Sequence, residues 1–345
     1  MQTSFWKDLR HRLEWLACAG LAGAIPRIPR RLCVALANGL GAIAYHVDVR
    51  GRRVALSNLA CVFPERPVAE RKLIARRSYQ NFARTMLDLF WGRRLTESNW
   101  RRYIEVEGDT DTFRREAQAH GAVSMCIHWG CFEWASHAVG FLGVPTLIVA
   151  ETFKNPRLSA VFNGSREISG HTIIPQENSM IRLLKVVKRK GAAGMLVDLT
   201  LHPNQAAVPI DAFGRKMCVT FMHAVLAQRG GARMVPVDGI PLPDGRCRIV
   251  IHPALPIPPD ATVQEIAQAC WDFYESRIRE RPELYLWAYK HWRYRPRAAA
   301  PEDYPFYANV SGAFEKLLEA NAPKKQAAAR AEDLTNESAS SALEP

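Results

Sequence analysis

Residues 124–135 read Ser124-Met125-Cys126-Ile127-His128-Trp129-Gly130-Cys131-Phe132-Glu133-Trp134-Ala135. An apolar run ends at a histidine, a glycine permits a turn, and a glutamate follows five residues after the histidine. Five residues place two side chains far apart around a helix and on opposite faces of a strand. The spacing therefore predicts a strand that stops at His128, a turn at Gly130, and Glu133 in the first turn of a helix. Glu133 would then orient one imidazole nitrogen while the other faces a substrate, which makes His128 a general base.

Taken alone, a histidine and a glutamate at this spacing are a weak signal, because chance produces the pattern often. A histidine that caps a helix, followed by a glutamate that the helix dipole favours, would look the same. Trp129, Phe132 and Trp134 flank the pair and predict that it is partly removed from water, as a poised base requires. Spacing and context leave both interpretations open.

Strands and helices alternate from about residue 108 onwards, which predicts an α/β fold with a mixed, mostly parallel sheet flanked by helices. The predicted strands are 122–127, 146–150, 172–174, 193–197, 234–237 and 248–251. The predicted helices are 132–142, 156–169, 179–190, 219–229 and 263–279. Residues after such strands face the ligand crevice. His128 follows the first strand and Asp198 the fourth, so both are candidate site residues.

The N-terminal segment is both basic and apolar. The chain carries a net charge of +12, and its first 53 residues hold nine basic residues against three acidic ones. Two apolar stretches, 16–25 and 32–47, are each shorter than the roughly twenty residues that span a bilayer. Arginines at their ends, with Trp6 and Trp15 nearby, favour helices that lie in an anionic membrane interface. The alternative is that both are buried helices of a soluble bundle.

The predicted organisation has five parts. Residues 1–50 form a membrane-associating helical segment, and 51–107 form a helical lead-in with helices at 54–59, 68–89 and 98–103. Residues 108–297 form the α/β core, which ends in an aromatic and basic run at 283–297. A C-terminal extension covers 298–321, and 322–345 has the composition of a disordered tail.

The eight cysteines are scattered without a disulfide framework, which indicates reduced thiols in a cytosol-facing protein. Cys126, His128 and Cys131 lack the fourth ligand and the second clustered pair that a zinc site needs, so we expect no metal. Cys131 could instead be a nucleophile with His128 as its base, which would make the protein a thiol hydrolase or thioesterase. A histidine oriented by Glu133 already suffices for direct transfer.

Several motifs in order resemble the lipid A biosynthesis lauroyl/myristoyl acyltransferases, whose H-x4-D/E signature places them with the lysophospholipid acyltransferase-like superfamily. The resemblance covers most of the chain. Its motifs are the His-Trp-Gly-Cys-Phe-Glu run at 128–133, Asn-Leu-Ala-Cys-Val-Phe-Pro-Glu at 58–65, Lys-Asn-Pro at 154–156, Val-Pro-Ile-Asp-Ala-Phe-Gly at 208–214, and the segment 287–296. The resemblance implies a glycerolipid acyltransferase-like fold with His128 and Glu133 as catalytic residues.

The resemblance also implies a set of substrate-binding residues. Arg166 would bind a substrate phosphate or the oxyanion that develops from the thioester. The alternative is that it is a solvated charge on a helix. Asp198 would position the acceptor or an arginine. The alternative is that it caps a helix or a turn. Phe213 and Gly214 belong to the segment that ends in Phe-Gly, and Arg293 belongs to the aromatic and basic close.

Two departures from the family pattern lie beside the expected site. Leu199 follows Asp198 where the family usually has glutamine, and Trp-Gly-Cys-Phe follows His128 where many members have Phe-Gly-Asn-Trp. Because of these changes the identity of the acceptor and of the acyl chain stays open, but the expected reaction is the same.

The resemblance predicts an acyltransferase at the cytoplasmic face of the inner membrane. It would move a fatty acyl chain from a thioester, acyl carrier protein in particular, to a hydroxyl of a lipid A precursor without a cofactor. One alternative is an acyltransferase for another lipid, such as a lysophospholipid or amino-lipid, that uses acyl-CoA. Another is a non-catalytic membrane or nucleic-acid binding protein. The aromatic and basic run could stack on bases, but no nucleotide or DNA-binding motif accompanies it, so we expect no nucleic-acid partner.

Overall fold

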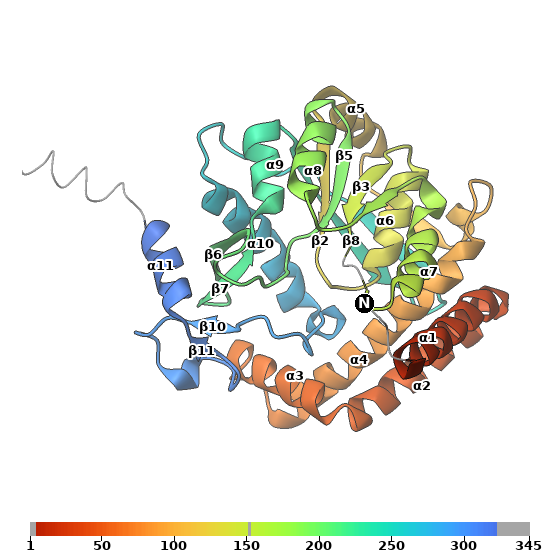
Figure 1. Ribbon diagram of the computed structural model, residues 1–345, viewed down its shortest axis with the longest axis horizontal. Coiled ribbons are helices and arrows are strands. Elements are labelled where there is room, and N and C mark those ends of the chain that lie inside the picture. Colours follow the sequence, from red (N-terminus) through yellow and green to blue (C-terminus); the bar gives the residue numbers. More distant parts are fainter. Residues whose placement is uncertain (1–4, 151–152, 323–345) are drawn as a thin grey trace, which may run out of the picture.

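The computed structural model describes residues 5–150 and 153–322 of the 345-residue chain. N-terminal helices lie along one side of a central sheet, other helices cover the sheet, and a small C-terminal segment lies at one end (Figure 1). The tail predicted to be disordered lies outside the described residues, apart from Ala322.

Prolines and a capping aspartate separate the N-terminal helices. Helix α1 (Phe5–Ala24) runs into the 3-10 turn η1 (Ile25–Arg27), and α2 (Arg30–Val47) begins directly after Pro29. Proline fixes its own backbone angle and lacks an N–H group, so it suits a helix start and not a helix interior. Asp48 caps α3 (Val49–Val62) by accepting a hydrogen bond from the Gly51 N–H, and Pro67 precedes α4 (Val68–Trp91). The four helices thus break where the sequence changes from helix formers to caps and prolines.

Within the described part of the chain, no single helix is long and apolar enough to cross a membrane. Helices α2 and α3 together satisfy the length and composition, but their axes are bent by 91°. The membrane-associating role of residues 1–50 therefore stays a prediction.

Seven strands form the main sheet in the order β1-β9-β8-β2-β5-β3-β4. Every neighbouring pair is parallel except β8 and β9. This confirms the predicted α/β class with a mixed, mostly parallel sheet. The strands are β1 (Ile104–Glu107), β2 (Ala122–Cys126), β3 (Thr146–Val149), β4 (Thr172–Ile174), β5 (Ala192–Leu196), β8 (Arg233–Pro241) and β9 (Cys247–Ile251).

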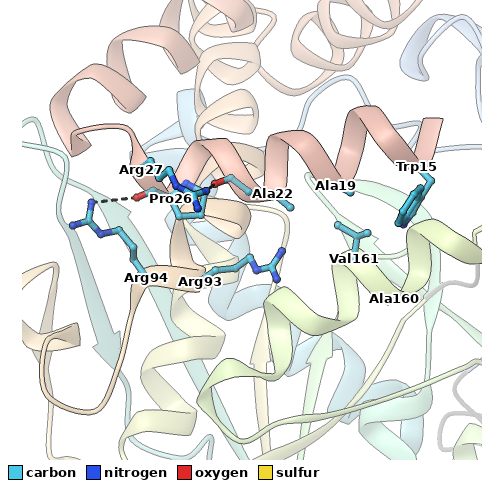
Figure 2. Close-up of a pocket in the computed structure, with 10 residues that line it drawn as sticks. Trp15, Ala19, Ala22, Pro26, Arg27, Arg93, Arg94, Ala160 and Val161 are labelled. Carbon is cyan, nitrogen blue, oxygen red and sulfur yellow. Dashed lines mark hydrogen bonds between the residues drawn. The ribbon is translucent and has the colours of Figure 1, made fainter. Parts of the chain in front are cut away.

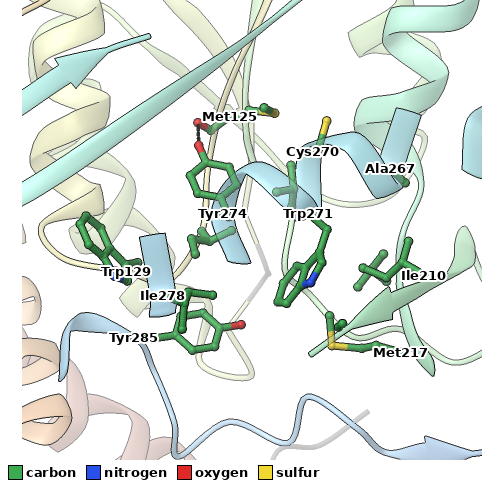
Figure 3. Close-up of a cluster of buried hydrophobic side chains, with 14 of the residues drawn as sticks. Met125, Trp129, Ile210, Met217, Ala267, Cys270, Trp271, Tyr274, Ile278 and Tyr285 are labelled. Atoms are coloured by element: carbon green, nitrogen blue, oxygen red, sulfur yellow. Dashed lines mark hydrogen bonds between the residues drawn. The ribbon is translucent and has the colours of Figure 1, made fainter. Parts of the chain in front are cut away.

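Helices cover both faces of this sheet. They are α5 (Thr110–His120), α6 (Phe132–Phe141), α7 (Pro156–Arg166), α8 (Ser179–Lys188), α9 (Met222–Gly230) and α10 (Val263–Glu280). Adjacent residues of β2 enter different cores, because side chains alternate across a strand. Val123 and Met125 pack with residues of α8, α9 and α10, whereas Ala122 packs with residues of α5 and α6. Figure 3 shows the first of these cores, where the hydroxyl of Tyr274 donates to the carbonyl of Met125.

Some elements escaped the sequence prediction. The strand β1 lies in the predicted lead-in, and α5 has only Phe113 and Ala117 buried, too few to mark a helical stripe. A separate hairpin, β6 (Ala207–Ala212) and β7 (Arg215–Thr220), was also missed. The predicted helix 219–229 begins at Met222 instead, because Val219 and Thr220 pair with β6.

The chain after α10 is mostly irregular. Its short elements are η5 (Pro282–Leu284), β10 (Tyr294–Arg295), η6 (Pro301–Asp303), β11 (Asn309–Val310) and α11 (Gly312–Ala320). The remaining 3-10 turns are η2 (Gly92–Arg94), η3 (Trp100–Arg102) and η4 (Glu167–Ser169). Between η5 and β10 the chain passes the carboxyl edge of β2, where the Leu286 N–H donates to the His128 carbonyl.

Candidate active site

Strand register brings His128 and Asp198 together. Strands β2 and β5 are parallel neighbours, and Cys126 at the end of one pairs with Leu196 at the end of the other. His128 and Asp198 each lie two residues further along. Because the register continues past the strand ends, the two side chains meet at the carboxyl edge of the sheet, where ligands bind in open α/β sheets.

Asp198 holds His128 through two hydrogen bonds. The imidazole Nδ1 lies 2.9 Å from Oδ1 of Asp198, and the main-chain N–H of His128 donates to Oδ2 at 3.0 Å. The Asp198 side chain is fully buried, and the His128 side chain keeps 19% of its surface exposed. A carboxylate can only accept, so Nδ1 carries the proton and Nε2 presents its lone pair.

The electrostatic balance raises the pKa of His128 above its ordinary value. Burial alone lowers this pKa, but the charge and hydrogen bond of Asp198, helped by the charge of Glu133, outweigh burial. Burial raises the pKa of Asp198, but the charge and hydrogen bonds of His128 bring it below its ordinary value. Asp198 therefore stays ionised and stabilises an imidazolium at His128.

Glu133 has a different partner from the one that the sequence predicts. It lies in the first turn of α6, as expected, but its carboxylate is bound by the guanidinium of Arg166 from α7. Nε donates to Oε2 at 3.1 Å and Nη2 donates to Oε1 at 2.6 Å. The residue that accepts the hydrogen bond from the His128 imidazole is therefore Asp198 and not Glu133 as predicted, and the guanidinium of Arg166 binds both carboxylate oxygens of Glu133. The charge of Glu133 raises the pKa of His128.

The pair of Glu133 and Arg166 remains ionised although it is largely buried. Burial raises the pKa of Glu133, but the charge and hydrogen bonds of Arg166 lower it below its ordinary value. The charge of Glu133 raises the pKa of Arg166. Among the described residues Nη1 of Arg166 has no hydrogen-bond partner, and 23% of the side chain is exposed. Arg166 therefore has a donor available for a ligand.

The turn after His128 is fixed by close backbone contacts. Gly130 has φ of 59°, and a Cβ there would collide with the Gly239 carbonyl oxygen. Its N–H donates to the Leu284 carbonyl, and its own carbonyl accepts a bond from Thr85 Oγ1 at 2.8 Å. Only glycine combines this backbone angle with this approach, so residue 130 sets the path from His128 to Glu133.

Aromatic rings border the imidazole on two sides. The Phe132 ring meets it edge-on at 5.2 Å between centroids, and the Tyr289 ring lies nearly parallel to it at 6.5 Å. The Arg293 guanidinium lies 5.2 Å from the centroid of the Tyr289 ring, so this predicted binding residue lies near the site without touching His128. Trp129 and Trp134 donate their indole N–H groups to the Arg281 and Asp88 carbonyls and pack in the two cores instead.

The segment 283–297 also contributes residues that sequence reasoning did not single out. The hydroxyl of Tyr285 lies 3.1 Å from Nδ1 of His291, and both side chains are buried. Burial lowers the pKa of His291 to about 4, while burial and the charge of Asp198 raise the pKa of Tyr285 well above its ordinary value. Both groups therefore stay neutral beside Asp198. The density of aromatic and basic residues drew attention to the segment but not to these members.

Phe213 and Gly214 form the turn of the β6–β7 hairpin, with φ of 51° and 75°. The Phe213 ring is buried against a group of aromatic rings, Phe63, Trp271, Trp287 and Trp292, at 5.9–6.4 Å between centroids. These contacts explain the Phe-Gly pair by packing and by the turn. A part in substrate binding stays a prediction for both residues.

The thiols near the site are not poised for reaction. Cys131 is buried, and burial raises the pKa of its thiol well above the ordinary value. Burial and the charges of Asp198 and Glu133 likewise raise the pKa of Cys126. A thiol nucleophile is activated by a lowered pKa, so the environment disfavours Cys131 as a nucleophile. Within residues 5–150 and 153–322, no three His, Cys, Asp or Glu side chains are grouped to hold a metal ion.

A histidine held by a buried carboxylate at the carboxyl edge of a mostly parallel sheet, with a cation beside it, is typical of enzymes that use general-base catalysis. The model of the bacterial lipid A biosynthesis acyltransferase family matches residues 2–294. The chain belongs to this family and is an acyltransferase.

Curated relatives match over most of their own length. The lipid A biosynthesis lauroyltransferase of Escherichia coli K12 is 23% identical over 293 residues, which cover 83% of this chain and 93% of the relative. The lipid A biosynthesis palmitoleoyltransferase of the same organism is 23% identical over 304 residues, 86% of this chain and 96% of the relative. The lipid A biosynthesis acyltransferase of Shigella flexneri gives the same values.

Proposed function

We propose that this enzyme transfers a fatty acyl chain from an acyl thioester, carried by acyl carrier protein, to a hydroxyl of a lipid A precursor. The observation that carries the proposal is the His128 imidazole, whose Nδ1 is bound to the buried Asp198 and whose Nε2 has no hydrogen-bond partner in the described part of the chain. Membership of the lipid A acyltransferase family supports the choice of acceptor. A thioester is already activated, so the reaction needs no metal or redox cofactor.

In the proposed mechanism Nε2 of His128 takes the proton from the acceptor hydroxyl, and the oxygen attacks the thioester carbonyl. The tetrahedral intermediate collapses and expels the thiolate. The thiolate takes the proton from Nε2, so the products are an ester and a free thiol. Asp198 keeps Nδ1 protonated and stabilises the imidazolium between the two proton transfers. General-base catalysis of this kind contributes about 10²–10⁴-fold to the rate.

Arg166 and Glu133 form a second functional unit in this mechanism. Arg166 offers Nη1 to the oxyanion of the intermediate or to a phosphate of the acceptor. Glu133 fixes the guanidinium in place by its two hydrogen bonds. Both oxygens of Glu133 face Arg166, so we propose that Glu133 acts as a positioning residue and affects His128 mainly by charge.

The proposed location is the cytoplasmic face of the inner membrane. Helix α2 exposes a line of large apolar side chains at helical spacing, and α1 adds more beside arginines and tryptophans. The exposed residues of α2 are Leu32, Leu36, Leu40, Ile43 and Val47. Water-exposed apolar stripes of this kind suit the interface of an anionic bilayer. The donor and acceptor would then meet at the membrane surface.

The test uses the purified protein with a lipid A precursor and matched acyl donors. Transfer from acyl carrier protein, detected by mass spectrometry of the lipid, is the expected result, with acyl-CoA and a lysophospholipid as the competing substrates. His128→Ala should lose activity by at least about 10²-fold. If the protein acylates the lysophospholipid and not the lipid A precursor, the proposed acceptor is wrong. If His128→Ala transfers the acyl chain at the wild-type rate, the proposed mechanism is wrong.

A further inference from the structure

A cleft of about 940 Å³ lies between α1, η1, η2 and α7. The catalytic side chains described above are not among the residues that line it. Figure 2 shows α1 forming one wall with Trp15, Ala19 and Ala22, and α7 forming the facing wall with Ala160 and Val161. A cleft of this size accommodates a headgroup with part of a chain.

Three arginines line the cleft, and Figure 2 shows the guanidinium of Arg93 extending along it while that of Arg94 points the opposite way, beyond Pro26. Arg27 follows α1, and Arg93 and Arg94 follow α4. Arg27 donates to the Gly23 carbonyl, and Arg94 donates to the Pro26 carbonyl at 3.1 Å, as Figure 2 shows. Among the described residues no carboxylate forms an ion pair with any of the three. Each guanidinium carries five N–H donors, so these bonds orient the side chains and leave donors for an anion.

One end of the cleft is apolar. Ala19, Ala22 and Val161 carry no polar side-chain atoms, and Trp15 is 38% exposed where α1 passes over α7. Further along α1, Leu13, Leu16 and Leu21 are exposed to a similar or greater degree. Positive charge and apolar walls in the same cleft match an amphiphile with an anionic head.

We propose that this cleft binds one anionic glycerophospholipid of the bilayer, with its phosphate between Arg27 and Arg93. One acyl chain lies between Trp15 and Val161. The lipid is an anchor and not the acceptor, because the lining residues belong to α1, η1, η2 and α7 and do not include His128, Asp198, Glu133 or Arg166. The bound lipid fixes α1 against α7, the helix that carries Arg166.

Vesicle binding tests this proposal without any catalytic turnover, so its result does not depend on the proposed reaction. The full-length protein is sedimented with phosphatidylcholine vesicles that contain or lack phosphatidylglycerol. Arg93→Glu is the main variant, because Arg93 is exposed and makes no ion pair among the described residues, so the change should leave the fold intact. We expect roughly a 10-fold or greater loss of binding to the anionic vesicles.

Two further variants separate a defined site from general charge attraction. Arg182→Glu changes the same charge on an exposed position of α8 and should bind as the wild type does. Ala160→Trp narrows the cleft without changing the charge and should weaken binding to anionic vesicles. Equal losses for Arg93→Glu and Arg182→Glu, or full binding by both Arg93→Glu and Ala160→Trp, would overturn the proposal.

The acceptor itself is the competing occupant. In detergent micelles without phospholipid, Arg93→Glu should leave the KM for the phosphorylated acceptor unchanged, because the anchor plays no part there. A KM raised several-fold in micelles would assign the arginines to the acceptor phosphate and reject the anchoring lipid. Thermal melting of each variant verifies that the fold is intact.

Discussion

Asp198 accepts hydrogen bonds from both Nδ1 and the main-chain N–H of His128, at 2.9 and 3.0 Å. The two residues are 70 positions apart in the chain and meet because β2 and β5 are parallel neighbours in register. The main-chain bond fixes the carboxylate relative to the strand end, so the imidazole orientation is tied to the sheet itself. This relationship determines which histidine nitrogen can take a proton.

Asp198→Asn should lower kcat by about 10²–10⁴-fold with little change in KM, because the amide neither stabilises an imidazolium nor enforces the Nδ1–H tautomer. Steady-state kinetics with the thioester donor measures the effect. Asp238→Asn is the matched control, since Asp238 is also buried and lies 2.8 Å from a histidine nitrogen, Nε2 of His252. An equal loss of kcat in both variants would mean that burial, and not the bond to His128, explains the defect.

The pH profile of kcat/KM should rise through a pKa above the ordinary value for histidine. The base must be neutral to accept a proton, and Asp198 and Glu133 together raise the pKa of His128 against the effect of burial. In Asp198→Asn the contribution of Asp198 is lost while the effects of burial and of Glu133 remain, so the pKa of His128 falls and the rising limb should move to lower pH. A limb at the same pH in both proteins would show that another group controls the rate.

Glu133→Gln should destabilise the protein and lower activity through Arg166. Removing one partner of a largely buried ion pair costs about 3–5 kcal/mol of stability, which thermal or denaturant unfolding can measure. Arg166→Gln should cost a similar amount. The double variant should cost clearly less than the sum, because the two residues act as a pair.

The same variants distinguish the two orienting residues. NMR of the histidine ring should retain the hydrogen-bonded Nδ1 proton of His128 in Glu133→Gln and lose it in Asp198→Asn. If the proton signal is lost in Glu133→Gln but kept in Asp198→Asn, Glu133 and not Asp198 orients His128.

Gly130→Ala should abolish most of the activity. The residue has a positive φ, and a Cβ would meet the Gly239 carbonyl oxygen, so the turn that carries His128 must shift. Gly231→Ala is the control, because it has a similar φ of 69° with open space around it. Both variants should lose roughly 1–2 kcal/mol of stability from the backbone angle. Only Gly130→Ala should also lose kcat, and full activity of this variant would contradict the role of the turn.

Leu36→Glu combined with Leu40→Glu should release the protein from membranes. Both side chains are exposed on α2, at 41% and 52%, so the changes should leave the fold intact. Burying one leucine at an interface contributes about 1.5–3 kcal/mol, so membrane binding should fall at least 10-fold. Ile181→Glu on α8, which is 71% exposed, should remain bound like the wild type. Cosedimentation with vesicles compares the wild type with the two variants. If the double variant still binds the vesicles, the membrane-binding surface is not on α2.

Local pattern predicted most of the helices and strands. The strand that ends before His128, the helix that begins at Phe132, and strand 172–174 all appear within a residue or two of their predicted bounds. Of the elements that escaped prediction, β1 is only four residues long and α5 has few buried apolar residues, whereas β6 contains Pro209 and is buried on both faces, so it shows no alternation. Periodicity needs several turns or alternations before it stands out from chance.

The sequence by itself determined the α/β class, the position of His128 at the end of a strand, the turn at Gly130 and the family. Only the tertiary structure decided the partners of the charged groups. The spacing of the sequence predicted that Glu133 binds His128. In the structure Glu133 binds Arg166 of α7, and His128 binds Asp198 because β2 and β5 are neighbours in the sheet. Hydrogen-bond partners depend on which strands and helices become neighbours, and that order is set by packing between residues far apart in the chain.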